Sequence, residues 1–258
     1  MPSNLPWIWQ AKSKDDWNRR AAGFAKRNIP SKYVVEFCSH LELHPGLTIL
    51  DVGSGPGTLS LYLADKVKKI TALDFSAEML EILNDKCAEA GINNIETVCC
   101  AWEDDWQKLE IEKHDLVIAS RSLAVDDLRS ALRKANDWAK TTVVVGDRVG
   151  NGPFNPDVFK AVGRNFTAGP DYIYTVNMLY AMGIQASVNF IEFEGQASFL
   201  TFDEAVDSCK WMLDKITPEE EAKFNHYMNK NVQQQPDGSW RFLPQNHPKW
   251  AVIQWKKK

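Results

Sequence analysis

Ten consecutive residues read Thr48-Ile49-Leu50-Asp51-Val52-Gly53-Ser54-Gly55-Pro56-Gly57. The first half is a short run of mainly apolar residues, and it predicts a buried strand over Thr48 to Val52. The second half has glycine at three alternate positions, which lets the backbone approach a ligand closely. Because a helical pattern follows, amide hydrogens of the loop can point at a bound group. The stretch therefore predicts a strand, a ligand-binding glycine loop and a helix.

Outward from this stretch, short β-branched runs alternate with helical patterns as far as residue 146. This alternation is typical of a parallel sheet covered by helices. Ser76 is the expected N-cap of one of these helices, and Gly91 is its expected end. The helix directly after the glycine loop should bury Leu59, Tyr62, Leu63 and Val67 on one face. The expected strands are Thr48–Val52, Lys69–Asp74, Ile95–Cys100, Asp115–Ala119 and Thr141–Gly146.

The pattern changes beyond residue 146, where Gly150-Asn151-Gly152-Pro153 and Gly169-Pro170 bracket an irregular insertion. The segments Thr201-Phe202-Asp203-Glu204 and Thr217-Pro218-Glu219-Glu220 read as capping boxes, so a second, helical insertion is expected. We predict cap helices within residues 1–45 and one domain over residues 46–258, with inserts at about 150–170 and 200–235. The remaining expected elements are helices at Lys14–Lys26, Ser31–Leu43 and Tyr172–Met182 and strands at Val188–Glu194 and Trp250–Trp255.

Composition narrows the class of protein. The 258 residues carry a formal net charge of -4. The chain therefore lacks the excess of positive charge that neutralising many phosphates requires, and we expect no nucleic-acid partner. The five cysteines form no CxxC pair or zinc spacing, which indicates no metal site and a reducing compartment. No apolar run approaches the ~20 residues that span a bilayer, so we expect a cytoplasmic protein without a membrane partner.

Two carboxylates bear on the choice of cofactor. Asp51 at the mouth of the loop would repel an anionic pyrophosphate but attract the ammonium and sulfonium groups of S-adenosylmethionine. Asp74 ends the second strand, where an acidic side chain can accept hydrogen bonds from both ribose hydroxyls of either cofactor. The dinucleotide fingerprint has its third glycine one place later than Gly57, where this chain has Thr58. The pattern thus favours S-adenosylmethionine over NAD.

Taken with Ala72-Leu73-Asp74-Phe75-Ser76-Ala77-Glu78-Met79-Leu80, the glycine stretch resembles the class I (Rossmann-like) S-adenosylmethionine-dependent methyltransferases of the small-molecule type. The resemblance covers roughly Trp17 to Asp147. It implies an α/β fold with a Rossmann-like, seven-stranded, mostly parallel sheet, an antiparallel last strand and helical cap inserts. Upstream, Asp16-Trp17-Asn18-Arg19-Arg20-Ala21 resembles a helix that often closes over the cofactor in this family.

The resemblance also implies a set of cofactor-binding residues. In the family, the stretch after the third strand forms the adenine pocket, and here this stretch is Ala101-Trp102-Glu103, with alanine where aspartate is commoner. The backbone after the fourth strand touches the methionine end, which places Ser120 in the site. The full implied set is Asp51, Gly53, Ser54, Gly55, Gly57, Asp74, Phe75, Ser76, Met79, Ala101, Trp102, Glu103 and Ser120.

On the substrate side, the Asn/Asp-Pro-Pro-Tyr/Phe signature of enzymes that methylate amide or base nitrogens is missing. Arg121 and Arg148 directly follow the fourth and fifth strands, where ligands bind in open α/β sheets, so an anionic acceptor is expected. Tyr174 is a further substrate candidate. If the acceptor is a hydroxyl, a base is needed, and the candidates are Asp126, Asp147, Tyr174 and His226.

The sequence therefore predicts an S-adenosyl-L-methionine-dependent methyltransferase that transfers a methyl group to a small molecule. Two alternatives stay open. One is a protein that binds the cofactor without catalysis, and the other is an NAD-dependent oxidoreductase, which Asp51 and Thr58 disfavour.

Overall fold

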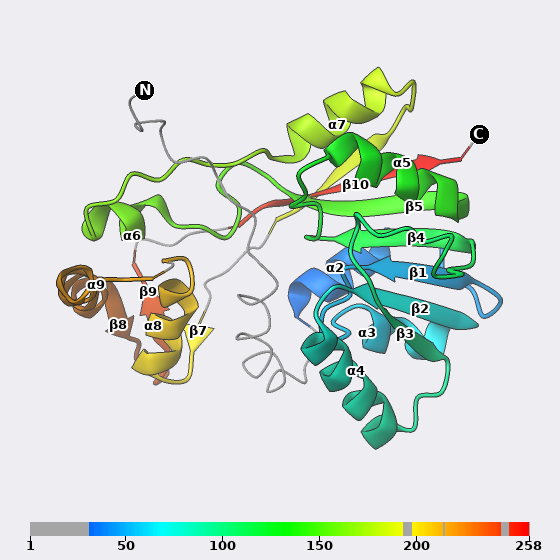
Figure 1. Ribbon diagram of the computed structural model, residues 1–258. Helices are drawn as coiled ribbons and strands as arrows, with labels where there is room; N and C mark the ends of the chain where they lie inside the picture. The colour runs from blue at the N-terminus through cyan, green and yellow to red at the C-terminus, as the bar shows by residue number, and fades with distance from the viewer. Residues whose placement is uncertain (1–30, 193–197, 214, 244–247, 258) are drawn as a thin grey trace. The chain divides into compact units, whose positions relative to one another are not determined.

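A seven-stranded sheet holds the larger part of the chain, in the strand order β3-β2-β1-β4-β5-β10-β6. In the computed structural model, residues 31–192, 198–213, 215–243 and 248–257 are described. The strands β1, β2, β3, β4 and β5 pair in parallel, whereas β10 runs antiparallel to β6. Their bounds are β1 Thr48–Val52, β2 Lys69–Asp74, β3 Ile95–Cys99, β4 His114–Ser120, β5 Ala139–Arg148, β6 Ser187–Ile191 and β10 Trp250–Lys256. Figure 1 shows the parallel strands side by side, and the predicted fold class is confirmed.

Helices cover both faces of this sheet, in the bounds α2 Lys32–Ser39, α3 Ser60–Leu63, α4 Ala77–Ala90, α5 Leu128–Trp138 and α7 Tyr172–Ala181. The predicted cap of α4 is confirmed, because Ser76 Oγ accepts from the amide of Met79 at 3.2 Å. Gly91 ends α4 in the left-handed conformation, as a residue without Cβ does easily. The predicted helix at Lys14–Lys26 and the segment Asp16–Ala21 lie outside the described residues.

The helix after the glycine loop is shorter than predicted. Only Ser60–Leu63 is α-helical, and the one-turn 3-10 helix η1 (Ala64–Lys66) continues it. Val67 is extended, with φ -137° and ψ 165°, because the chain must turn there to enter β2. Val67 is buried, but it lies outside the helix on whose face the sequence placed it.

The chain forms two compact units. The chain leaves the sheet unit twice, at residues 148–171 and at residues 192–249. The described residues of these two ranges belong to the second unit. The second unit contains α6 (Pro156–Ala161), α8 (Phe202–Lys210) and α9 (Pro218–Asn231), which share a core of their own. That core contains Val158, Ala205, Cys209, Phe224 and Met228 among its buried members. The predicted domain division at residue 45, with two inserts, stays a prediction.

The sequence missed a small sheet in the second unit. The strands β7 (Ser198–Phe199), β9 (Trp240–Phe242) and β8 (Val232–Gln234) are antiparallel in that order. The prediction of two full capping boxes was also wrong in one case. Thr217 and Glu220 bond reciprocally at the start of α9. At the start of α8, Thr201 caps the amide of Glu204, but the Glu204 carboxylate accepts from Leu200 instead.

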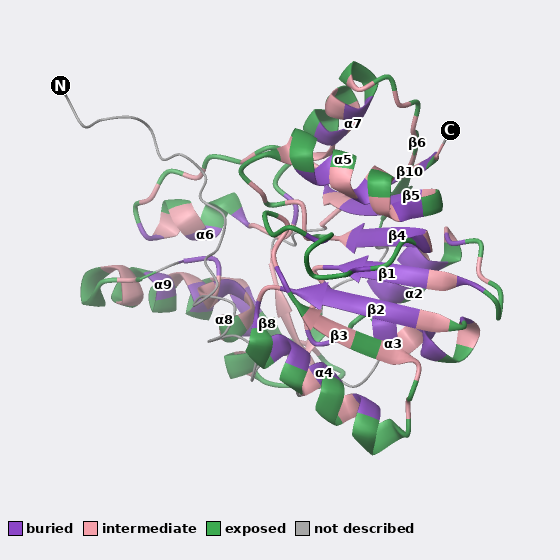
Figure 2. Cartoon of the chain, turned by 45° about the vertical axis from the view of Figure 1, so that its right-hand side comes forward, coloured by how far each residue is buried: buried purple, intermediate pink, exposed green. Residues whose placement is uncertain are grey.

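Burial is greatest in the middle of the seven-stranded sheet, as the purple strands in Figure 2 show. Ile49 and Leu50 of β1, and Val117 and Ile118 of β4, are fully buried. Neighbouring residues are thus buried on both faces of the sheet, which is typical of parallel strands between helices. The carboxyl ends of β1, β2 and β4 consequently emerge together from a rigid core.

Candidate functional site

The glycine loop leaves β1 in a conformation that few other residues tolerate. Gly53, Gly55 and Gly57 all have positive φ, at 73°, 55° and 81°. The amides of Gly53 and Ser54 both donate to the carbonyl oxygen of Leu73, at 2.8 and 2.9 Å. The loop is therefore tied to the end of β2 as well as to β1.

Two of the three glycines are also required by close packing. A Cβ on Gly53 would lie 2.3 Å from Cβ of Ser122, and one on Gly57 would lie 2.3 Å from Cδ1 of Leu83. At Gly55, by contrast, a Cβ would meet nothing within 4 Å. The middle of the loop is thus open, and a ligand can approach the backbone there.

Asp74 joins the loop to the end of β2. Its Oδ2 accepts from the amide of Gly55 at 2.8 Å, and its Oδ1 accepts from the amide of Ser76 at 2.9 Å. Burial raises the pKa of the Asp74 carboxyl, and these backbone donors oppose the rise. The amide of Phe75 is a further donor to this carboxyl. A carboxylate has about four acceptor positions, so it can still accept a hydrogen bond from a ligand.

Asp51, which the sequence placed at the mouth of the loop, is buried in the structure. Its side chain is buried, only 2 % exposed, and its Oδ2 accepts from Ser60 Oγ at 2.7 Å. Burial raises the pKa of Asp51 to about 7, with the negative charge of Asp74 adding to the rise. The charge of Asp51 therefore depends on pH near neutrality. The sequence does not indicate this dependence, because it does not show that the side chain is buried.

Ser54 supplies a buried hydroxyl beside the open glycine. Its Oγ has no hydrogen-bond partner among the described residues. A buried hydroxyl without a partner is costly, and a polar group that binds beside it removes this cost. The Ser54 hydroxyl, which has no partner among the described residues, fits a polar cofactor lying on the loop. The open space beside Gly55, where a Cβ would meet nothing within 4 Å, also fits such a cofactor.

The loop after β3 is held in place by several polar contacts. The indole Nε1 of Trp102 donates to the carbonyl oxygen of Ser122 at 3.0 Å, and its ring stacks on that of Trp106. Lys134 of α5 donates from Nζ to the carbonyl oxygens of Trp102 and Asp104, at 2.5 and 2.6 Å. The half-buried Trp102 ring is thus fixed between the loops that follow β3 and β4.

The other predicted cofactor-binding residues near this loop and at the start of α4 differ in their surroundings. The amide of Ala101 donates to Asp104 Oδ2 at 2.7 Å, which places a carboxylate next to this position. Glu103 is exposed. Phe75 is half-buried, whereas Ser76 and Met79 are buried and form the start of α4. Ser76 and Met79 are therefore held together at the start of α4.

At the end of β4, Ser120 and Arg121 meet an aromatic cluster. The hydroxyls of Ser120 and Tyr33 are 2.6 Å apart. The Arg121 guanidinium lies over the rings of Tyr33 and Trp250, with its carbon 4.3 and 5.5 Å from the ring centres. Arg121 itself is exposed.

The remaining substrate and base candidates have separate surroundings. Arg148 is buried, and its Nε and Nη2 both donate to the carbonyl oxygen of Pro170, at 2.9 and 2.8 Å. Tyr174 is 60 % exposed on α7. Asp147 Oδ2 accepts from Thr175 Oγ1 at 2.7 Å, while Asp126 is exposed after β4 and His226 is exposed on α9. None of these contacts singles out a base.

Sequence reasoning missed four residues that organise this edge: Ser122, Lys134, Tyr33 and Trp250. Each acts on a partner at least 20 residues away along the chain, so no local pattern marks it.

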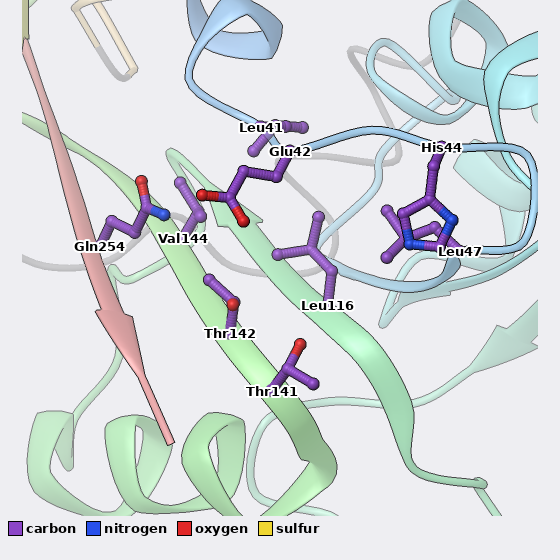
Figure 3. Close-up of a pocket in the computed structure, with 9 residues that line it drawn as sticks. All are labelled: Leu41, Glu42, His44, Leu47, Leu116, Thr141, Thr142, Val144 and Gln254. Carbon is purple, nitrogen blue, oxygen red and sulfur yellow. The ribbon is translucent and has the colours of Figure 1, made fainter. Parts of the chain in front are cut away.

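The pocket in Figure 3 lies toward the amino ends of the parallel strands, whereas the site described above is at their carboxyl ends. It has a volume of about 130 Å³, and its walls include Leu47, which precedes β1, and Thr141 and Thr142 from the first half of β5. Glu42 and Gln254 also line it. Because ligands in open α/β sheets bind at the carboxyl ends of the strands, this pocket is not part of the site described above.

The chain is similar to known methyltransferases. Residues 49–142 match the family model described as "Methyltransferase domain". An uncharacterised protein of Haemophilus influenzae is 30% identical over 93% of this chain and 88% of its own length. The YcgJ protein of Bacillus subtilis has a TM-score of 0.60 at 15% identity, covering 87% of this chain and 97% of its own.

Two shorter matches are to proteins that are named for different activities. Pavine N-methyltransferase of Thalictrum flavum is 27% identical over 40% of this chain and 29% of its own length. A "probable ribosomal RNA small subunit methyltransferase A" of Methanosphaera stadtmanae is 34% identical over 28% of this chain and 26% of its own.

Among the described residues, no helix has both the length and the apolar character that crossing a membrane requires. The family match begins in β1 and ends in β5, so it includes the glycine loop, Asp74 and Trp102. The chain belongs to the class I (Rossmann-like) methyltransferases, the family whose methyl-donating cofactor is S-adenosyl-L-methionine.

Proposed function

We propose that this chain binds S-adenosylmethionine at the carboxyl edge of its sheet and transfers the methyl group to a small molecule. The observation that carries the proposal is the Asp74 carboxylate, which is fixed by the amides of Gly55 and Ser76 beside an open glycine loop. A carboxylate in this position can accept hydrogen bonds from both ribose hydroxyls. The unpartnered Ser54 hydroxyl supports a polar ligand on the same loop.

Other residues at the carboxyl edge of the sheet would complete the binding of the cofactor and position the acceptor. The Trp102 ring is already held by Ser122 and Trp106. Little conformational entropy of this side chain is therefore lost when a flat base packs on the ring. The bound cofactor supplies a methyl group activated by the sulfonium charge. The chain's part in the reaction is then to position the acceptor and to exclude water, and a protein base is not required for an acceptor that is already nucleophilic.

A small-molecule acceptor is supported by the charge of the chain and by the pavine N-methyltransferase match. The net charge of -4 speaks against an extended RNA-binding surface. The four buried cysteines are free thiols, as we expect of a protein that works in the cytoplasm. Arg148 and Tyr174 stay outside the proposal, since Arg148 donates to Pro170 and Tyr174 is exposed on α7.

Titration calorimetry of the full chain with S-adenosylmethionine, S-adenosylhomocysteine and NADH tests the cofactor. We expect the first two to bind and NADH not to bind. Folded protein that binds neither sulfur compound at millimolar concentration would refute the proposal, and tight NADH binding would favour an oxidoreductase.

Turnover is tested separately from binding. We would measure release of S-adenosylhomocysteine with a panel of hydroxyl, amine and thiol metabolites and with a ribosomal RNA fragment. Release with a metabolite supports the proposed acceptor class, whereas release with RNA alone overturns it. A chain that binds the cofactor but turns over nothing would be a non-catalytic binding protein.

A further inference from the structure

Arg121 has an unusual backbone for its residue type. It has φ 59°, and Glu110 is the other non-glycine residue with positive φ among those described. This region is unfavourable for a residue with a Cβ, and such outliers concentrate at ligand sites. The conformation is held by the amide of Arg121, which donates to the carbonyl oxygen of Gly146 at 2.8 Å. The strain therefore lies at the end of β4, one residue from Ser122, which packs against the glycine loop.

The side chain of Arg121 rests on two rings that are themselves fixed. Tyr33 and Trp250 pack edge to face, with ring centres 5.6 Å apart. Tyr33 is also within hydrogen-bond distance of Ser120, at 2.6 Å. A guanidinium stacked on an aromatic face keeps its N–H groups available at its edge. The rings thus lie against the Arg121 guanidinium without using its hydrogen-bond donors.

The charge of Arg121 is not neutralised by a neighbouring acid. No carboxylate of a described residue forms an ion pair with its guanidinium, which lies in an exposed position. Asp147 is near enough to affect Tyr33, but its Oδ2 accepts from Thr175. In contrast, Arg164 pairs with both oxygens of Glu220, at 2.7 and 2.8 Å. Within the described part of the chain, Arg121 therefore offers a guanidinium that makes no ion pair with a carboxylate.

We propose that Arg121 binds an oxyanion, a carboxylate or a phosphate, on the methyl acceptor. The inference rests on the proposed function, because it places the acceptor beside the cofactor loop. A planar fork binds such groups through two parallel hydrogen bonds, which fixes the direction of the acceptor as well as its distance. Ser122, the next residue, donates to the carbonyl oxygen of Val52 at 2.7 Å, which ties the backbone beside Arg121 to the end of β1.

The test uses the full chain saturated with S-adenosylhomocysteine and two matched pairs of probes. Benzoate is compared with benzamide, and phenyl phosphate with phenol, by calorimetry at constant ionic strength. We expect one anion to bind on the order of tenfold more tightly than its neutral partner. The pair that shows the preference distinguishes a carboxylate from a phosphate. Arg121→Met should abolish the preference, and Arg133→Met, which removes an exposed arginine on α5, should leave it unchanged.

Arg121→Lys is a second variant that keeps the positive charge. We expect it to bind S-adenosylhomocysteine normally and to lose much of the anion preference, because an ammonium cannot make two parallel bonds. Equal binding of anionic and neutral probes by the wild-type chain would overturn the inference. So would a preference that survives in Arg121→Met. If the wild-type chain does not bind S-adenosylhomocysteine at all, the proposed function fails first.

Discussion

The indole Nε1 of Trp102 donates to the carbonyl oxygen of Ser122, 20 residues further along the chain, at 3.0 Å. Ser122 also donates from Oγ to the carbonyl oxygen of Val52 at 2.7 Å, and its Cβ fills the space beside Gly53. One serine thus connects the loops that follow β1, β3 and β4. Displacing it should disturb the predicted adenine and methionine ends of the site together.

The first prediction compares two glycines of the loop. Gly53→Ala should destabilise the fold by about 2–5 kcal/mol, because left-handed strain adds to a collision with Ser122. Gly55→Ala has the same kind of strain but no collision, so about 1–2 kcal/mol is expected. Urea unfolding measures both. Equal losses would show that the loop relaxes away from Ser122.

The second prediction concerns the ribose carboxylate. Asp74→Ala should weaken S-adenosylhomocysteine binding by about 1.5–3 kcal/mol, because it removes a charged acceptor from the two hydroxyls. Asp85→Asn, on the exposed side of α4, serves as the control and should bind normally. Calorimetry measures both dissociation constants, and an unchanged value for Asp74→Ala would assign the ribose to another carboxylate.

The third prediction follows from the buried Asp51. Its folded-state pKa is raised to about 7 from an unfolded value of 3.8. The protonated form is therefore favoured by folding, so this contribution to stability is complete below pH 3.8 and is lost as the pH rises through 7. Relative to Asp51→Asn, the wild-type chain without cofactor should lose about 2 kcal/mol between pH 5.5 and 8.5. Parallel slopes of unfolding free energy against pH for the two proteins would contradict the assignment.

The fourth prediction concerns Lys134, which holds the loop after β3 through two carbonyl oxygens. Lys134→Met keeps most of the side-chain length but removes both hydrogen bonds. We expect the KM for S-adenosylmethionine to rise several fold with little change in kcat, because the lysine positions Trp102 and touches no reacting atom. Lys113→Met, in the exposed segment directly before β4, is the matched control. A fall in kcat alone would disprove a purely positioning role.

The fifth prediction isolates the backbone strain at Arg121. Both Arg121→Ala and Arg121→Gly lose the guanidinium and its stacking on Tyr33, but only glycine has no Cβ at φ 59°. Arg121→Gly should therefore be more stable than Arg121→Ala by about 1 kcal/mol. Thermal and urea unfolding give the difference directly. Identical stabilities would mean that the backbone leaves the left-handed region in one of the variants.

The parts of the site that sequence predicted best are those set by local chemistry. The bounds of β1 and β2, and the cap at Ser76, follow from residues adjacent in the chain, and the structure confirms them. The orientation of Asp51 did not follow, because all but one of the β1 residues are buried and no polar face marks a direction. The sheet of β7, β8 and β9 was missed because strands of two or three residues are too short to show a period.

Contacts between distant segments could not be predicted either, because no local pattern in the sequence marks them. Tyr33 meets Ser120 across 87 residues, and Trp102 meets Lys134 across 32. Neither pair has a spacing that a helix or a strand repeats. The chemistry of the loop was thus predictable, while its supports were visible only once the chain had folded.

The place of β10 in the sheet governs the order in which the fold can be completed during synthesis. β10 is the last strand in the chain, yet it lies between β5 and β6. While the ribosome is still making residues 192–249, β6 has no partner in the sheet on the side where β10 will pair, and its amides are open to wrong neighbours. Insertion of residues 250–256 closes that gap and brings Trp250 beside Tyr33. A nascent chain can therefore place Trp250 against Tyr33 only after β10 has left the exit tunnel.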